Sequence, residues 1–132
     1  MARGGLGYEG IKAHQTTFKA GAGIKALVVS DGKDSVVGVP VVISGNDTVD
    51  LGTDGDTVFG FIDVYENDSH VSVQDEGYRT DVPIGAIAPT VGKIAAVDGT
   101  GKSKDSATTA KLRSPVFTNV DSVAKTATIF LG

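Results

Sequence analysis

The chain has 132 residues, with 12 Lys and Arg against 16 Asp and Glu, which gives a formal net charge of -4 at pH 7. Binding to nucleic acid needs clustered positive charge, and the longest apolar run, residues 39–43, is far too short to span a membrane. We therefore expect neither a nucleic-acid nor a membrane partner. The absence of Cys excludes disulfides, thiolate catalysis and zinc ligation by Cys.

Glycine is the compositional outlier, with 18 residues, about twice the number expected from its usual share of roughly 7%. Gly supplies turns with positive φ and weakens helix interiors. Together with many Val, Ile and Thr residues, it favours short strands joined by tight turns. The chain is also long enough for one domain with a core of its own.

Residues 1–17 differ from the rest and are predicted to form an extended N-terminal arm. Four of the first ten residues are Gly, and between them stand the isolated large side chains Leu6, Tyr8 and Ile11. A disordered tail usually carries fewer such side chains, whereas an arm that orders against a neighbour uses them as anchors. A frayed terminus is the alternative. No apolar core of a signal peptide is present, so we expect synthesis in the cytoplasm.

Residues 18–132 are predicted to form a single β domain, because short apolar runs alternate there with Gly and Asp turns. The clearest strand covers residues 69–75, where Val71 and Val73 point one way and the polar residues between and beside them point the other. The other predicted strands lie at residues 26–30, 36–43, 48–51, 58–65, 78–82, 93–97, 114–120 and 123–131.

The last two of these strands are expected to form a C-terminal hairpin, and the polar residues 98–111 an exposed loop. No amphipathic helix of standard length is apparent. Roughly eight to ten short strands without such a helix predict a small β-barrel or β-sandwich.

The strand predicted at residues 58–65 is apolar on both faces. Phe59, Phe61 and Tyr65 share one of these faces. A strand of this kind is buried on both sides or covered by a neighbouring subunit. The three aromatic residues are therefore candidates for a subunit-interface patch, with the domain core as the alternative.

One segment nearly matches a phosphate-binding loop. The sequence AVDGTGKS, residues 96–103, fits the pattern G-x-x-x-x-G-K-S except that Ala96 replaces the first Gly. Such a loop must lead from a strand into a helix whose N-terminus holds the phosphate. The following residues have little apolar face and end at Pro115, so no nucleotide site is expected.

No metal or catalytic site is predicted. Asp54 and Asp56 begin like a calcium loop, but Val58 stands at the third ligand position. His14 and His70 are the only histidines, and neither has a carboxylate at helical spacing to complete a metal site.

The motifs of enzymes are missing as well. The nucleophile elbow G-x-S-x-G does not occur, and the carboxylate pair Asp75–Glu76 belongs to a turn rather than to an apolar pocket that would raise a pKa. We expect no enzyme activity and no cofactor.

Five segments taken together resemble the small capsid decoration, or cement, proteins of tailed bacteriophages. In chain order they read AGAGIKALVV, GDTVFGFIDV, HVSVQDEGY, PIGAIAPTVGKIAAVDGTGK and TATIFLG. They match a Gly/Ala-rich opening, a G-D-x-V-x-G strand entry, a strand with alternating valines, a V-D-G-T-G-K turn and a closing aliphatic strand. The resemblance covers residues 20–131. The arm and the loop at 98–111 are less typical of the family.

The resemblance implies a protein that binds the outer surface of the mature icosahedral head and bridges major capsid subunits against the pressure of the packaged DNA. Its partner would be the major capsid protein, its location the virion, and its state a homo-oligomer, with a trimer favoured over a dimer. Leu6, Tyr8 and Ile11 are then the candidate capsid-contact residues of the arm.

Two alternatives remain open at the level of the sequence. The first is another virion component, from a tail or head fibre, although such proteins more often carry repeats or long coiled coils. The second is a carbohydrate-binding β module, which would use exposed Trp or several neighbouring Tyr residues. The chain has no Trp and three scattered Tyr.

Overall fold

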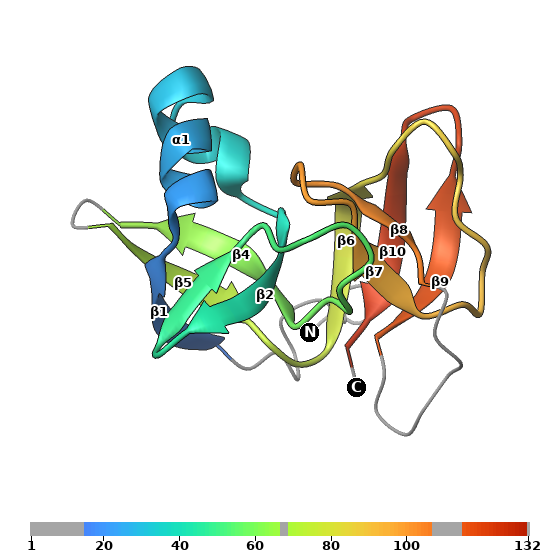
Figure 1. Cartoon of the computed structure of the whole chain (residues 1–132). Coiled ribbons are helices and arrows are strands. Elements are labelled where there is room, and N and C mark those ends of the chain that lie inside the picture. The colour runs from blue at the N-terminus through green and yellow to red at the C-terminus, as the bar shows by residue number, and fades with distance from the viewer. Residues whose placement is uncertain (1–14, 67–68, 107–114, 132) are drawn as a thin grey trace, which may run out of the picture.

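The computed structural model describes residues 15–66, 69–106 and 115–131. These residues form a closed β-barrel and a second β unit that lie side by side (Figure 1). They contain ten strands, one α-helix and one 3-10 helix, which confirms the predicted all-β fold with a small barrel. We call the two parts the N-terminal barrel and the C-terminal unit.

The N-terminal barrel closes through five strands in the order β1-β3-β2-β4-β5. Neighbouring strands are antiparallel except for β1 and β3, which are parallel. The helices α1 and η1 connect β1 to β2. The elements are β1 (Gln15–Ala20), α1 (Ala22–Asp31), η1 (Lys33–Val36), β2 (Pro40–Gly45), β3 (Thr48–Asp50), β4 (Gly60–Tyr65) and β5 (His70–Gln74).

The C-terminal unit contains a three-stranded sheet in the order β6-β10-β9 and the two-stranded sheet β7-β8. Two isolated bridges link these sheets, one antiparallel between Ile94 and Val116 and one parallel between Ile84 and Ser103. The strands are β6 (Tyr78–Pro83), β7 (Ala95–Val97), β8 (Ser103–Asp105), β9 (Val116–Asp121) and β10 (Thr126–Phe130).

With these bridges, the C-terminal unit repeats the topology of the N-terminal barrel. Its strands follow one another around a ring as β6-β8-β7-β9-β10, which is the order β1-β3-β2-β4-β5 with each number raised by five. In both rings the first and third strands are the parallel neighbours. The sequence showed no repeat, because strand pairing is repeated here and residue identity is not.

Residues 26–30, predicted to be a strand, lie within α1, so that prediction is wrong. The run of Leu27, Val28 and Val29 suggested a strand, but the helix is stabilised by a carboxylate far away in the sequence. The Asp50 carboxylate in β3 accepts hydrogen bonds from the backbone N–H of Ile24 at 3.1 Å and of Gly23 at 3.4 Å. These are N–H groups that the first turn of a helix leaves without partners.

Glycine at the start of α1 makes this contact possible. Gly21 is the N-cap residue and has no side chain with which to cap the helix itself. A Cβ atom at Gly21 would lie 2.4 Å from Cγ of Asp50, which is too close for any side chain. Gly21 thus leaves room for Asp50 to perform the capping from β3.

The other strand predictions agree with the structure to within a few residues, whereas two observed strands, β1 and β8, have no counterpart among the predicted ones. β1 begins at Gln15 and pairs with β5, so residues 15–17 belong to the barrel and not to the predicted arm. Within the predicted loop 98–111, residues 103–105 form β8 and Ser103 is buried.

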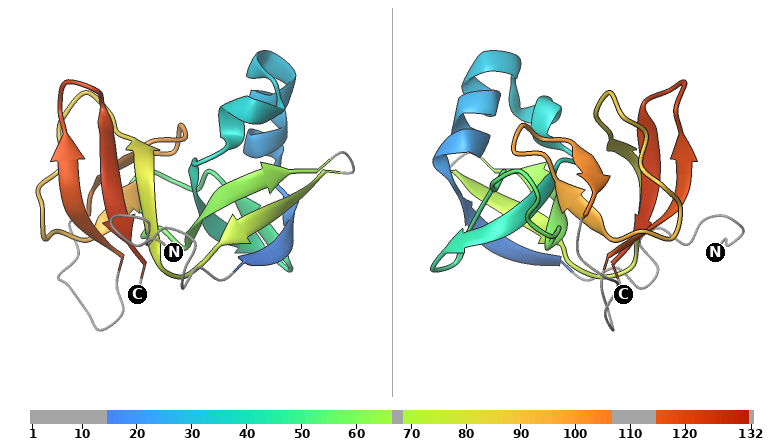
Figure 2. Two further views of the ribbon diagram at one scale, coloured as in Figure 1. Left: turned by 180° about the vertical axis from the view of Figure 1, so that it is seen from behind. Right: turned by 45° about the vertical axis from the view of Figure 1, so that its right-hand side comes forward.

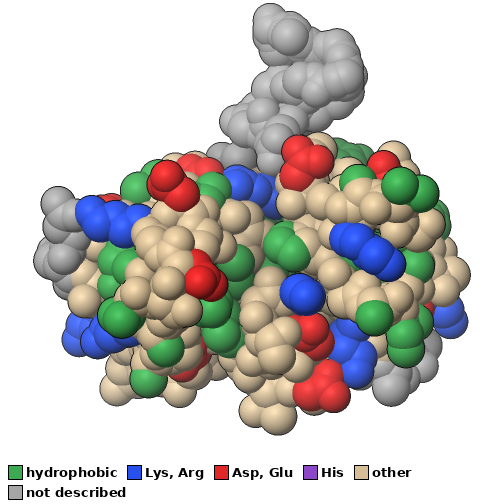
Figure 3. Space-filling view, turned by 90° about the horizontal axis from the view of Figure 1, so that it is seen from above, with side chains coloured by type: hydrophobic (Ala, Val, Ile, Leu, Met, Phe, Trp, Pro, Cys, Tyr) green, Lys and Arg blue, Asp and Glu red, His purple; other side chains and the backbone are tan. Residues whose placement is uncertain are grey.

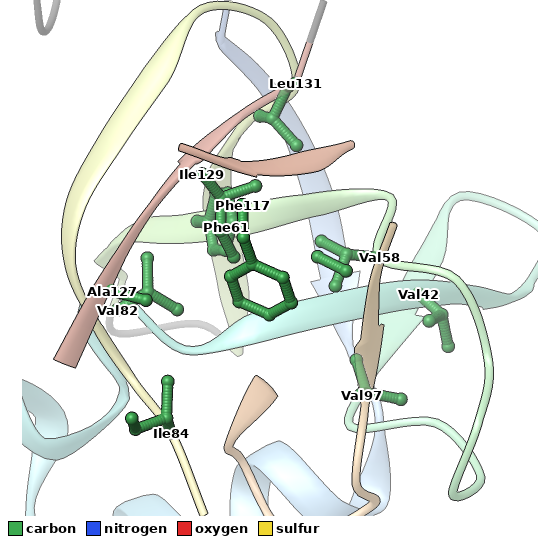
Figure 4. Close-up of a cluster of buried hydrophobic side chains, with 11 residues drawn as sticks. Val42, Val58, Phe61, Val82, Ile84, Val97, Phe117, Ala127, Ile129 and Leu131 are labelled. Carbon is green, nitrogen blue, oxygen red and sulfur yellow. The ribbon is translucent and has the colours of Figure 1, made fainter. Parts of the chain in front are cut away.

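The two parts have separate cores that meet around Phe61. The core of the N-terminal barrel contains Ile62, Val71 and Val73, all fully buried. The core of the C-terminal unit contains Phe117 and Ile129 but also accepts side chains from the N-terminal barrel (Figure 4). These contributed side chains are Val42, Val58 and Phe61.

We predict that Asp50→Ala lowers the free energy of unfolding by about 0.5–2 kcal/mol, the usual cost of losing an N-cap acceptor. Urea unfolding followed by circular dichroism would measure the loss. Glu66→Ala, which removes an exposed carboxylate, is the control and should unfold near the wild-type midpoint. Equal midpoints for Asp50→Ala and the wild type would contradict the capping role.

Candidate interaction surfaces

The aromatic residues predicted as an interface patch do not share one surface. Phe61 is fully buried in the core of the C-terminal unit, so it has no surface to offer another subunit. Phe59 and Tyr65 are half-buried against the core of the N-terminal barrel. Phe59 packs edge-on against Phe18, with ring centroids 5.6 Å apart and an angle of 87° between the ring planes.

Strand geometry explains why the predicted alternation fails. β4 begins only at Gly60, so Phe59 lies outside the strand. Within β4, Ile62 pairs with Val73 and Val64 pairs with Ser72, which leaves Asp63 as an extra residue. A bulge of this kind interrupts strict alternation, and the sequence carries no clear signal for it.

The arm residues Leu6, Tyr8 and Ile11, and also His14, lie outside the described residues. His70 is half-buried in β5. Among the residues that the structure describes, no group of three His, Asp or Glu side chains is arranged to hold a metal ion. No described helix has the length and apolar character needed to cross a bilayer.

Asp54 and Asp56, considered as calcium ligands, both have partners within the protein. The Asp54 carboxylate forms an exposed ion pair with Lys104, with Oδ1 and Nζ 2.8 Å apart. The Asp56 carboxylate accepts a hydrogen bond from the backbone N–H of Thr53 at 3.0 Å. The Asp56 contact closes the turn at residues 53–56, and the Asp54 ion pair joins this turn to β8.

The phosphate-loop-like segment is the turn of a β-hairpin and leads into a strand. Val97 in β7 pairs directly with Ser103 in β8, and the turn between them uses Gly99 and Gly101 at φ values of 87° and 102°. The backbone N–H groups of this turn point at a carboxylate of the same turn. Asp98 Oδ1 accepts hydrogen bonds from the N–H and hydroxyl of Thr100, both at 2.8 Å, and from the N–H of Lys102 at 3.2 Å.

These contacts determine the acidity of Asp98. Partial burial raises the pKa of its carboxyl, but the hydrogen bonds from Thr100 and Lys102 and the positive charge of Lys102 outweigh this effect, so that the pKa lies below its usual value. The anion that this turn holds is thus its own side chain.

An open polar hollow is lined by residues of β6, β9 and β10. Its volume is about 160 Å³, and its lining includes Asp81, Asn119 and Asp121. The Asp121 carboxylate already accepts hydrogen bonds from the backbone N–H groups of Val123 and Ala124, each at 3.0 Å. The Asp121 carboxylate therefore stabilises the β9–β10 turn.

Among the described residues, the three most exposed large apolar side chains belong to segments that extend toward one end of the molecule, which we call the upper face. Val29 on α1 is 88% exposed, Ile87 in the connection after β6 is 86% exposed and Val123 in the β9–β10 turn is 92% exposed. α1, the β9–β10 turn and the start of the connection after β6 all extend toward this end (Figures 1 and 2). Seen from this end, hydrophobic side chains lie on both halves of the surface, between charged ones (Figure 3).

An aromatic pair lies near the opposite end. Tyr78 at the start of β6 and Phe130 at the end of β10 are paired across the two strands. Their ring centroids are 4.6 Å apart, and the side chains are 40% and 36% exposed. We call this surface the Tyr78–Phe130 face. Sequence reasoning missed it, because the two residues are brought together only by strand pairing.

Comparison of the chain with models of known protein families, with curated proteins and with solved structures gives no match.

The Asp98 turn yields a prediction about pH. Because its pKa is lower in the folded than in the unfolded chain, ionised Asp98 stabilises the fold above the unfolded-state pKa of about 3.9. This contribution is lost as the pH falls through the lower folded-state pKa. We expect Asp98→Asn to be less stable than the wild type at pH 7, and the difference to shrink toward about pH 2.

Urea unfolding of both proteins across this pH range measures the difference. Thr100→Val, which removes one donor to the carboxylate, should reduce the pH dependence without abolishing it. A difference in unfolding free energy that stays constant with pH would contradict the role assigned to the ionised carboxylate.

Proposed function

We propose that the protein is a capsid decoration protein of a tailed bacteriophage, which binds the outer surface of the mature head and bridges major capsid subunits. The observation that carries this proposal is the upper face. Its three most exposed large apolar side chains come from both halves of the molecule. Single exposed apolar residues are common, but a face spread over two joined units suits a broad, flat partner.

The sequence supports the same proposal. The resemblance to decoration proteins extends over residues 20–131 and therefore includes both the N-terminal barrel and the C-terminal unit. A protein that acts only by binding needs a rigid frame and a contact surface, and no catalytic group. On this proposal the protein is located on the virion, and its partner is the major capsid protein.

Binding would be weak for one copy and strong for several. Burial of apolar surface contributes about 25 cal/mol per Å² before the costs of ordering are subtracted, and three aliphatic side chains bury little area. In a homo-oligomer, each bound copy raises the effective concentration of the next one. A lattice of identical capsid subunits offers the repeated sites that such multivalent binding requires.

Co-sedimentation with expanded, undecorated shells of the companion capsid protein tests the proposal. We expect saturable pelleting at a fixed ratio to capsid subunits. Absence of pelleting by correctly folded protein would overturn the proposal and shift attention to a tail component or a carbohydrate-binding module.

The contribution of the upper face can be tested with a matched pair of variants. The double variant Val29→Ser and Val123→Ser removes two apolar side chains from exposed positions, so it should fold with a stability within about 0.5 kcal/mol of the wild type. We expect its half-saturation concentration on shells to rise several-fold. Ile43→Ser, in β2 and half-exposed, should bind shells as the wild type does. Equal binding by the double variant and the wild type would rule out the upper face as the contact surface.

A further inference from the structure

Because the strand topology repeats, residues at the end of one unit can be matched one to one with residues at the end of the other. In the N-terminal barrel, Phe61 pairs with Gln74, and Ile62 pairs with Val73. In the C-terminal unit, the equivalent pairs are Val116 with Phe130 and Phe117 with Ile129. Both hairpins then have one extra residue on the first strand, Asp63 in β4 and Thr118 in β9. The last position of β5, Gln74, thus corresponds to the last position of β10, Phe130.

The chain that enters the C-terminal unit covers Gln74. This side chain is only 2% exposed. Its Nε2 donates hydrogen bonds to the backbone carbonyls of Glu76 and Tyr78, at 2.9 and 2.8 Å. Its Oε1 accepts one from Arg79 at 3.3 Å. The segment leading from the first unit into the second therefore closes this end of the first unit.

Among the described residues, the equivalent end of the C-terminal unit is more exposed. Phe130 corresponds to Gln74 but is 36% exposed, and its neighbour Tyr78 is 40% exposed. The two rings form a compact aromatic surface, with centroids 4.6 Å apart. Aromatic side chains in this setting are typical anchors of protein interfaces.

A second copy of the chain carries a suitable segment in the corresponding place. Its residues 1–14 lead into its own N-terminal barrel, just as residues 75–77 lead into the C-terminal unit. Fourteen residues span at most about 45–50 Å when extended, which is ample to reach a neighbouring molecule. The segment contains Leu6, Tyr8 and Ile11, side chains that can bury the two exposed rings.

We propose that the Tyr78–Phe130 face receives the N-terminal segment, residues 1–14, of a second copy of this chain. The N-terminal barrel of one copy is then placed next to the C-terminal unit of another copy, in the same way as the C-terminal unit is placed next to the N-terminal barrel within one chain. The contact joins two different surfaces, so it is heterologous, and its repetition closes a ring or continues as a filament. The association requires no capsid shell and goes beyond the proposed function.

Site-directed cross-linking tests this contact, because the chain has no Cys of its own. One chain carries Glu9→Cys, between Tyr8 and Ile11 in the sequence. A second chain, with an affinity tag, carries Thr128→Cys, two residues from Phe130 on the same side of β10. The matched control carries Val123→Cys, which is 92% exposed at the opposite end of the β9–β10 hairpin.

We expect the disulfide-linked product of two chains to form several-fold more with Thr128→Cys than with Val123→Cys under mild oxidation. Equal yields with the two acceptors would overturn the proposal. A second result would also overturn it. In that result, the chain carrying both Glu9→Cys and Thr128→Cys forms only an internal disulfide at low concentration, and a mixture of the two single variants forms no disulfide between chains. That result would show that the segment covers its own chain.

Sedimentation equilibrium provides a second readout. The full chain should show a mass that rises with concentration. Deletion of residues 2–12, or Phe130→Ser, should shift the protein toward the monomer while leaving the circular dichroism spectrum unchanged. Val123→Ser should associate as the wild type does. A monomeric wild type at all concentrations would overturn the proposal. Shell pelleting is measured separately through the upper-face variants, so failure of one proposal is distinguishable from failure of the other.

Discussion

The arrangement of the molecule depends on the insertion of side chains from the N-terminal barrel into the core of the C-terminal unit. Phe61 is fully buried there, together with Val42 and Val58. A buried aromatic side chain of this kind typically contributes about 3–5 kcal/mol, and here it stabilises both units at once. Because the two units share this core, they cannot separate without exposing it to water.

Polar contacts reinforce the same junction. Arg79 in β6 forms an ion pair with Asp63 in β4, with Nη1 and Oδ1 3.0 Å apart and the side chains mostly shielded from solvent. Arg79 also donates a hydrogen bond to Gln74, and Gln15 in β1 donates one to Asp63. Asp63 is the extra residue of the β4 bulge. The bulge thus turns a carboxylate toward the neighbouring unit, a use often made of such irregularities.

The two units share a topology but differ in the connection between their first two strands. In the N-terminal barrel this connection forms α1 and η1, whereas in the C-terminal unit it is irregular. Both connections carry exposed apolar side chains, Val29 in the first and Ile87 in the second. The strand topology that the two units share provides the frame, and the connections in which they differ supply the surface that we propose for contact with a shell. The open Tyr78–Phe130 face lies near the other end, so both contacts can be made at once.

Local pattern alone determined several features of this protein. Alternation placed Val71 and Val73 on one buried face, because burial on one face of a strand imposes a period of two. Turn residues located the C-terminal hairpin. The context of the AVDGTGKS segment argued against a phosphate loop, and the structure shows a hairpin turn there.

Only the tertiary structure decided the rest, since it depends on partners that are distant in the sequence. α1 is capped by Asp50, 26 residues from Ile24. Phe61 is buried because a second unit covers β4. Tyr78 and Phe130 become neighbours only when β6 pairs with β10. Non-local pairing also produces the repeat, which leaves no trace in residue identity because many apolar residues of similar size can occupy equivalent core positions.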